Sequence, residues 1–219
     1  MSTFPNSPKI LKGGIVLIDP DTSAVLRIIV MQYNPDNLTR TLQAQAIGPE
    51  PGDRLEALRL KGPPLETLKL EAEIDATDQL AATQPDNTVL QYGIHPQLAA
   101  LETLIYPTSA QLLANNRQAT MGTLEIAPIQ APLAVFVWSQ TRVLPIRLTD
   151  FSITEEAFDT TLNPIRAKVS LGMRVLTVDD LGYEHKGGNL FIRYLQRKEQ
   201  LVALAPGGAF TSLGIAGIP

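Results

Sequence analysis

Hydrophobic and polar residues alternate most regularly in two stretches of the chain, residues 65–75 and 165–175. In the first, the apolar positions are Leu68, Leu70, Ala72 and Ile74, and in the second they are Ile165, Ala167, Val169, Leu171, Met173 and Val175. A period of two places apolar side chains on one face of a strand and polar side chains on the other. Both stretches are therefore predicted to be half-buried β-strands, the first with an acidic and the second with a basic outer face.

Shorter apolar runs separated by turn residues predict more strands. Residues 13–18 and 26–33 flank an Asp-Pro-Asp turn at residues 19–21, which is typical of a β-hairpin. Residues 38–45 alternate and predict a third strand, and residues 133–138 are apolar throughout. The pattern therefore favours an antiparallel sheet over a helical fold.

A longer strand is predicted over residues 142–153, where the parity of the apolar positions changes. Leu148 belongs to one parity and Phe151 to the other. An extra residue in one strand shifts the register by one position, so we expect a β-bulge near Thr149 and Asp150.

Helical spacing of apolar residues occurs in two regions. Residues 94–106 place leucines on one face and carry Pro96 in the first turn, and residues 111–115 extend or follow that helix. A second helix is predicted over residues 183–204. The remaining segments are expected to be a loop at residues 48–64 with a helical turn at 55–60, a linker at 77–93, a short strand at 123–126 and an uncharged C-terminal arm.

Composition narrows the classes of function. The 219 residues carry a formal net charge of −4, and only 18% of them are charged. A nucleic-acid-binding protein normally has a concentrated basic surface, so we expect no nucleic-acid partner. No cysteine is present, which excludes disulfides and cysteine ligands or nucleophiles. Without an apolar run near the roughly twenty residues of a spanning helix, we expect no membrane insertion and cytoplasmic synthesis and assembly.

Candidate catalytic residues are few and scattered. His95 and His185 are the only histidines, and neither adjoins a nucleophile motif such as G-x-S-x-G. We therefore interpret both as capping or surface residues. The chain is expected to be no enzyme and to hold no cofactor and no metal.

Two stripes of opposite charge are the better candidates for function. Glu71, Glu73 and Asp75 share one strand face, and Arg166, Lys168 and Arg174 share another. The stripes are able to pair across a contact between two copies of the chain, or as neighbouring strands of one sheet. Tyr194, in the second predicted helix, is a further candidate for an interface.

Three motifs in order resemble the tube-type proteins of contractile injection systems, which are phage-tail-like particles. The first is Gln32-Tyr33-Asn34-Pro35 after a strand, the second is the run from Ala131 to Trp138, and the third begins at Asn163-Pro164-Ile165-Arg166-Ala167. The resemblance covers roughly residues 9–180. It suggests scaffold roles for Tyr33, Asn34, Pro35, Trp138, Pro164 and Ala167.

The resemblance implies an antiparallel tail-tube-like β-barrel or sandwich with a flanking helix and a C-terminal helical arm. It divides the chain into an N-terminal arm (1–11), a tube-type β domain (12–180) and a C-terminal extension (181–219). The implied function is a baseplate hub adaptor that joins the inner tube to the spike and nucleates tube assembly. Its implied partners are further copies in a six-membered ring, the inner tube protein, the spike protein and other baseplate proteins.

The chain departs from the family pattern in two places, and alternatives stay open. Ser139 follows the tryptophan where the family usually has glycine, and the residues after 180 are too few for a complete LysM module. An inner tube or tube-initiator protein is the alternative within the family. A peptidoglycan- or carbohydrate-binding module is the alternative of another class, although only 5% of the residues are aromatic. The particle itself is cytoplasmic, membrane-anchored or released.

Overall fold

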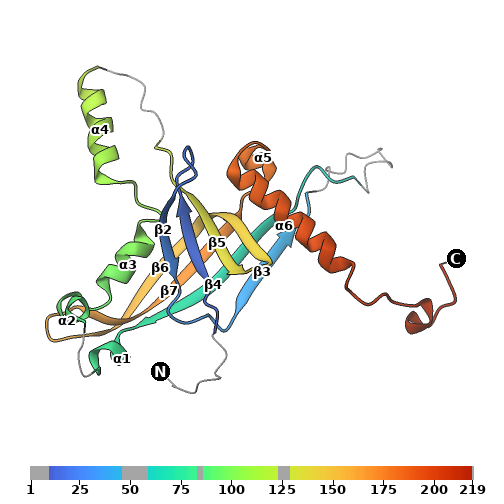
Figure 1. Cartoon of the computed structure of the whole chain (residues 1–219), viewed down its shortest axis with the longest axis horizontal. Helices are drawn as coiled ribbons and strands as arrows, with labels where there is room; N and C mark the ends of the chain where they lie inside the picture. The colour runs from blue at the N-terminus through green and yellow to red at the C-terminus, as the bar shows by residue number, and fades with distance from the viewer. Residues whose placement is uncertain (1–9, 46–58, 83–85, 123–128, 219) are drawn as a thin grey trace, which may run out of the picture.

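The computed structural model describes residues 10–45, 59–82, 86–122 and 129–218, which form a mixed α+β fold around one antiparallel sheet (Figure 1). The strands are β1 (Gly14–Ile18), β2 (Val25–Val30), β3 (Leu38–Gln43), β4 (Leu65–Asp75), β5 (Leu133–Ser139), β6 (Arg142–Phe158) and β7 (Pro164–Val175). The helices are α1 (Thr77–Leu80), α2 (Asn87–Tyr92), α3 (His95–Glu102), α4 (Ser109–Thr120), α5 (Val178–Leu181) and α6 (Lys186–Val202), followed by a 3₁₀ turn, η1 (Phe210–Leu213).

The sheet has seven strands in the order β2-β1-β5-β6-β7-β4-β3, and each neighbouring pair is antiparallel. The predicted antiparallel, mainly β fold is therefore confirmed. The sheet is not closed into a barrel, because β2 and β3 form two separate edges. A single chain thus leaves two rows of backbone hydrogen-bonding groups without a strand partner in the described sheet.

Local predictions from the hydrophobic pattern are confirmed for the strands. β1 and β2 form the expected hairpin, and the register of β6 against β7 shifts between Leu148 and Asp150, where the bulge was expected. Gly172 lies opposite the bulge, where a Cβ atom would stand 2.7 Å from Oδ2 of Asp150. The absence of a side chain at this position therefore makes room for the bulged residue.

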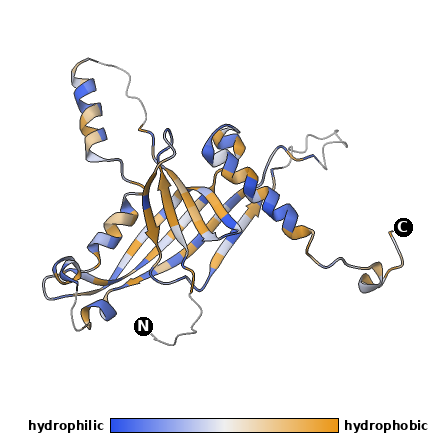
Figure 2. Cartoon of the chain, viewed as in Figure 1, coloured by the Kyte–Doolittle hydropathy of each residue, from blue (hydrophilic) through white to orange (hydrophobic). Residues whose placement is uncertain are grey.

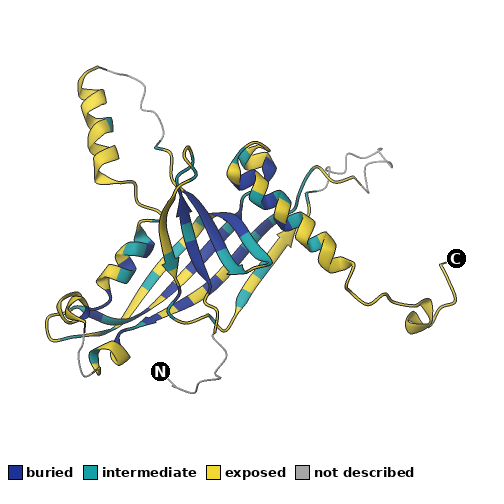
Figure 3. Cartoon of the chain, viewed as in Figure 1, coloured by how far each residue is buried: buried dark blue, intermediate teal, exposed yellow. Residues whose placement is uncertain are grey.

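The core lies on one face of the curled sheet (Figure 3). The alternating apolar residues of β4 and β7 are buried as predicted, and Phe136 of β5 is buried beside them. Leu98 and Leu101 of α3 cover this face at one end of the sheet. A smaller cluster on the opposite face contains Ile18, Leu133 and Val135.

Helix α6 belongs to the same core. Phe191 and Tyr194 lie three residues apart on one helical face, and both are buried in the main cluster. Residues 203–218, after α6, extend away from the sheet, as does α4 (Figure 1).

Several predicted boundaries differ from the structure. The expected linker at residues 77–93 contains α1 and α2, and Asp86 caps α2 by accepting a hydrogen bond from the Thr88 N–H. Residues 94–106 form only the short helix α3, and α4 begins separately after a capping box between Thr108 and Gln111. α2 and α4 begin at side-chain caps, whereas α1 and α3 have none. A search for apolar periodicity does not detect such caps.

Some predictions fall outside the described residues. These are most of the N-terminal arm (1–11), most of the loop at 48–64 with its helical turn, and the strand at 123–126.

A paired contact of Gln32 holds the curl of the sheet. Its Oε1 accepts a hydrogen bond of 3.0 Å from the Asp75 N–H, and its Nε2 donates to the Asp75 carbonyl. Gln32 follows β2 and Asp75 ends β4, although four strands separate β2 from β4 in the sheet. The amide group of Gln32 thus bonds the N–H and the carbonyl of Asp75 as a neighbouring strand would, although β2 and β4 are not neighbours in the sheet.

Asn34 ties the same turn to the start of β1. Its Oδ1 accepts from the Gly13 N–H at 2.9 Å, and its Nδ2 donates to the Leu11 carbonyl at 2.8 Å. Gly13 has no room for a side chain, since a Cβ atom would lie 2.9 Å from the ring of Trp138. Trp138 in turn stacks on Phe136, with ring centroids 5.9 Å apart.

The remaining scaffold candidates occupy both buried and exposed positions. Pro164 is buried at the first residue of β7, and its carbonyl accepts from the Ile94 N–H at 2.9 Å. Ala167 is fully buried, while Pro35 is partly and Tyr33 largely exposed.

Replacing Gln32 with alanine removes both hydrogen bonds and leaves the Asp75 backbone groups without them. We expect Gln32→Ala to lower the free energy of unfolding by about 1–3 kcal/mol. Chemical denaturation measures the change, and Gln43→Ala on the exposed end of β3 is the matched control. Equal stability of the two variants would contradict the role of the Gln32 contact.

The turn between β6 and β7 holds a carboxylate, Asp159, whose hydrogen bonds depend on pH. Oδ1 of Asp159 accepts from the N–H groups of Thr161 at 2.7 Å and Asn163 at 2.8 Å. The side-chain hydrogen bond from Asn163, with these backbone bonds, lowers the pKa of Asp159 from 3.8 to about 2. Because the folded pKa is depressed, the stabilising contribution is complete above pH 3.8 and is lost as the pH falls through about 2.

An NMR titration of the Asp159 carboxyl carbon should therefore give a midpoint near 2. In Asn163→Ala, which removes the first of these hydrogen bonds, we expect the midpoint to move toward the ordinary aspartate value. A normal midpoint in the unsubstituted chain would show that the hairpin tip does not hold this geometry in solution.

Candidate functional site

The acidic and basic stripes meet inside the sheet. β4 and β7 are neighbours, with Glu73 opposite Lys168 and Asp75 opposite Arg166. Nη2 of Arg166 lies 2.8 Å from Oδ2 of Asp75, and its Nε lies 4.0 Å from Oε1 of Glu73. Burial acts to raise the pKa of Asp75, but hydrogen bonds from Thr77 and Arg166 outweigh burial and lower it.

The other charged candidates also have partners within the chain. Lys168 contacts Glu156 at 2.9 Å, and this hydrogen bond and charge raise the pKa of Lys168. Arg174 contacts Asp180 at 2.6 Å, and Glu71 lies opposite Ser170. Of the two open alternatives, the structure realises the pairing of neighbouring strands. Each of these half-exposed pairs contributes little to stability. Their role is to align β4 with β7, and they do not by themselves define a contact between copies.

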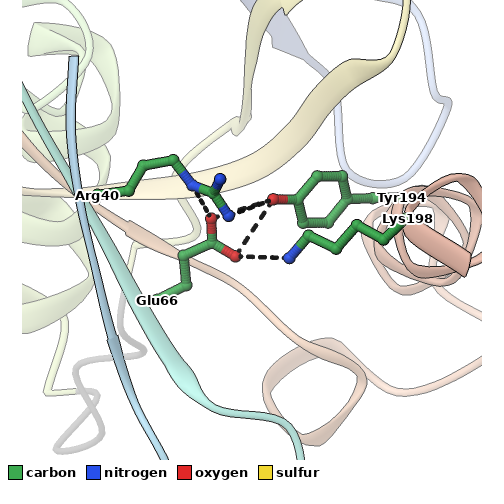
Figure 4. A network of polar contacts seen from close by, with 4 residues as sticks. All are labelled: Arg40, Glu66, Tyr194 and Lys198. Atoms are coloured by element: carbon green, nitrogen blue, oxygen red, sulfur yellow. Dashed lines mark hydrogen bonds and ion pairs between the residues drawn. The ribbon is translucent and has the colours of Figure 1, made fainter. Parts of the chain in front are cut away.

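A buried carboxylate anchors α6 to the β3–β4 edge of the sheet (Figure 4). Glu66 is 3% exposed, and it accepts hydrogen bonds from Nε of Arg40 at 2.9 Å, the Tyr194 hydroxyl at 3.1 Å and Nζ of Lys198 at 3.3 Å. Lys198 also lies 4.0 Å from the centre of the Tyr194 ring. The buried charge is thereby paired and hydrogen-bonded, as a buried carboxylate requires.

This network changes the interpretation of Tyr194 and adds a residue that the sequence analysis missed. Tyr194, expected at an interface between chains, is 5% exposed and makes its contacts within the chain. Glu66 was missed because it stands outside the regular acidic stripe. Its parity along β4 is that of Leu68 and Leu70, and this was the signal that it points into the core.

The two histidines lie at the starts of helices. Nδ1 of His185 accepts from the Gly187 N–H at 3.1 Å and so caps α6, in agreement with the prediction of a capping residue. His95 is the first residue of α3 and is exposed.

The edge strand β2 has an unusually apolar exposed surface. Its side chains Val25, Leu26, Ile28 and Val30 are between 53% and 63% exposed. Figure 2 shows β2 as part of a hydrophobic group of strands at the centre of the molecule. Edge strands usually carry charges, bulges or prolines that prevent pairing with another chain. β2 has one charged residue, Arg27, and is otherwise apolar, so it is suited to being covered.

Beside β2, a cavity of about 350 Å³ opens between β2, β4 and α3. Its walls are mainly apolar and include Ile29, Met31, Ile74 and Leu101. Gln97 of α3 also lines it, and its Oε1 atom is buried without a hydrogen-bond partner in the structure. A buried oxygen atom without a hydrogen-bond donor is unfavourable, so this cavity suits an occupant that supplies a donor.

No known protein family model matches the chain, and a search of curated proteins also found no match. Within residues 10–45, 59–82, 86–122 and 129–218, no helix has the length and apolar content needed to cross a membrane. Among the same residues, no three His, Asp or Glu side chains are grouped so that they could hold a metal ion.

The anchoring network gives a direct prediction. Glu66→Ala leaves the cationic groups of Arg40 and Lys198 without their carboxylate, so we expect a loss of roughly 2–4 kcal/mol in the free energy of unfolding. Tyr194→Phe removes one hydroxyl and should cost only about 1 kcal/mol. Hydrogen exchange should accelerate most in α6 of Glu66→Ala, and unchanged protection there would exclude an anchoring role.

Proposed function

We propose that the chain is a structural subunit of a contractile injection system, in which copies assemble into a ring through the edges of their sheets. One observation carries the proposal: the seven-stranded sheet ends at two unpaired edges, and one of them, β2, is apolar and exposed. The other edge, β3, has the same length of six residues. Pairing of β2 with β3 of the next copy would continue the sheet from one subunit to another.

A contact between two different edges joins copies head to tail. Such a heterologous contact forms a closed ring when the rotation between copies divides a full turn, and a filament when it does not. The curl of the sheet favours closure, since every added copy continues the same curvature. The tail-tube-like barrel of the proposed assembly therefore belongs to the ring and not to the single chain.

Within this class, we place the subunit at the baseplate hub as the adaptor between inner tube and spike. The order of the three sequence motifs supports this position. Asn34, in the first of those motifs, also holds the turn after β2 to the start of β1 through two side-chain hydrogen bonds. The partners would be further copies, the inner tube protein, the spike protein and other baseplate proteins. An inner tube or tube-initiator protein would use the same edges.

Ile28 on β2 provides the test of assembly. It is 63% exposed, so Ile28→Lys should leave the fold intact but place a charge in the proposed contact. We expect at least a tenfold rise in the concentration needed for assembly, because burying an unpaired charge costs more than about 1.4 kcal/mol. Light scattering with negative-stain microscopy measures mass and shape.

Leu113→Lys on α4 is the matched control, since Leu113 is 56% exposed and lies far from β2 along the chain. Rings of the unsubstituted chain and of the control, with smaller species for Ile28→Lys, would support the proposal. A monomer at all concentrations that binds neither tube nor spike protein would overturn it. A screen against glycans would then test the binding-module alternative.

A further inference from the structure

The segment after α6 is an uncharged apolar arm that the other described residues of its own chain leave exposed. Residues 200–219 contain no charged side chain, and every residue from 199 to 218 is exposed. Its large apolar side chains are Leu204, Phe210, Leu213, Ile215 and Ile218. An exposed apolar segment of this size is typical of a surface that another chain covers.

The position of α6 determines where the arm leaves the molecule. Glu66 holds Tyr194 and Lys198 at the β3–β4 edge, and the arm continues beyond this edge (Figure 1). The cavity beside β2 is lined by Ile74, near the other end of β4. Eight residues of strand separate Glu66 from Ile74, which corresponds to about 26 Å.

In the proposed ring, β3 of one copy lies beside β2 of the next. The α6 of the first copy is fixed to its own β3, so it is carried to the β2 of its neighbour. That β2 forms one wall of the neighbour's cavity. The arm therefore starts at the edge that faces the neighbour's β2, and the neighbour's cavity lies within the reach of the arm.

We propose that the C-terminal arm of each copy docks into the cavity between β2, β4 and α3 of the adjacent copy. This inference rests on the proposed function, because head-to-tail pairing brings the arm to the cavity. The apolar side chains around Phe210 and Leu213 fill the cavity. A backbone N–H of the arm donates to the unpaired Oε1 of Gln97.

Size and reach agree with this occupant. The cavity of about 350 Å³ falls in the range of small ligand sites, so it accepts one or two large side chains and not a folded element. The sixteen residues 203–218 span at most about 55 Å when extended. The glycines of the arm permit close approach of its backbone to the cavity walls.

A second cavity, of about 820 Å³, was the other candidate receptor. It is lined by α4, by the loop between α3 and α4, by residues 129–132, by the turn at residues 19–21 and by Leu26 of β2. It contains no residue of β3 and touches β2 only at Leu26. Edge pairing alone does not separate the two cavities, but among the described residues only the cavity beside β2 is lined by a buried side-chain acceptor without a hydrogen-bond partner, Oε1 of Gln97.

The lack of native cysteines allows a specific crosslinking test in the full chain. One preparation carries Ala100→Cys in the cavity wall, and a second carries Leu213→Cys in the arm. The two are mixed, oxidised mildly, and analysed for disulfide-linked dimers. Leu113→Cys on the exposed face of α4 replaces Ala100→Cys in the matched control.

We expect at least tenfold more linked dimer with Ala100→Cys than with Leu113→Cys, because docking raises the local thiol concentration to about millimolar. Adding Phe210→Ser to the arm should abolish this difference. Equal yields of linked dimer with Ala100→Cys and with Leu113→Cys would overturn the inference. So would efficient linkage within one chain that carries both Ala100→Cys and Leu213→Cys at high dilution.

Light scattering on the same samples separates this inference from the proposed function. Rings without preferential linkage would remove the arm docking and leave edge assembly intact. Preferential linkage without rings would support the docking and overturn the ring. Monomers without linkage would contradict both.

Discussion

The contact between Gln32 and Asp75 ties the end of β2 to the end of β4 across the curled sheet and so underlies the core, the cavity and the open edges. An antiparallel sheet twists by itself, but twist alone does not bring the end of β2 to the end of β4. The two hydrogen bonds of Gln32 join these segments across four intervening strands. They hold the curl that gives α3 an apolar surface to cover and leaves a cavity beside β2.

The curl has a second consequence at the edges. Since β2 and β3 do not pair with each other, their backbone groups remain available at opposite ends of one sheet. Glu66 then couples α6 to the β3 edge, so the direction of the C-terminal arm follows the direction of that edge. A small number of polar contacts thus sets both where another copy can bind and where the arm is delivered.

Particular residues show how far sequence reasoning reached. The strands were predictable because burial of one face imposes a period of two, and the bulge at Asp150 was predictable because it changes that period. The short helices α1 and α2 were missed because four and six residues are too few to show a helical period of apolar positions. Glu66 was missed, although its parity along β4 is that of Leu68 and Leu70, because it stands outside the regular acidic stripe. The charged stripes left two alternatives, and only the strand order showed that β4 and β7 are neighbours.

The pattern of residues was enough to predict which segments are strands, which face of each is apolar, and that the fold is mainly antiparallel β. These properties are local, since they follow from the side chains of one segment and its turns. The strand order, the open edges, the curl and the burial of Tyr194 became known only from the three-dimensional structure. Each of these depends on contacts between residues far apart in the chain, such as the 43 positions between Gln32 and Asp75. Periodicity within a segment carries no information about such partners.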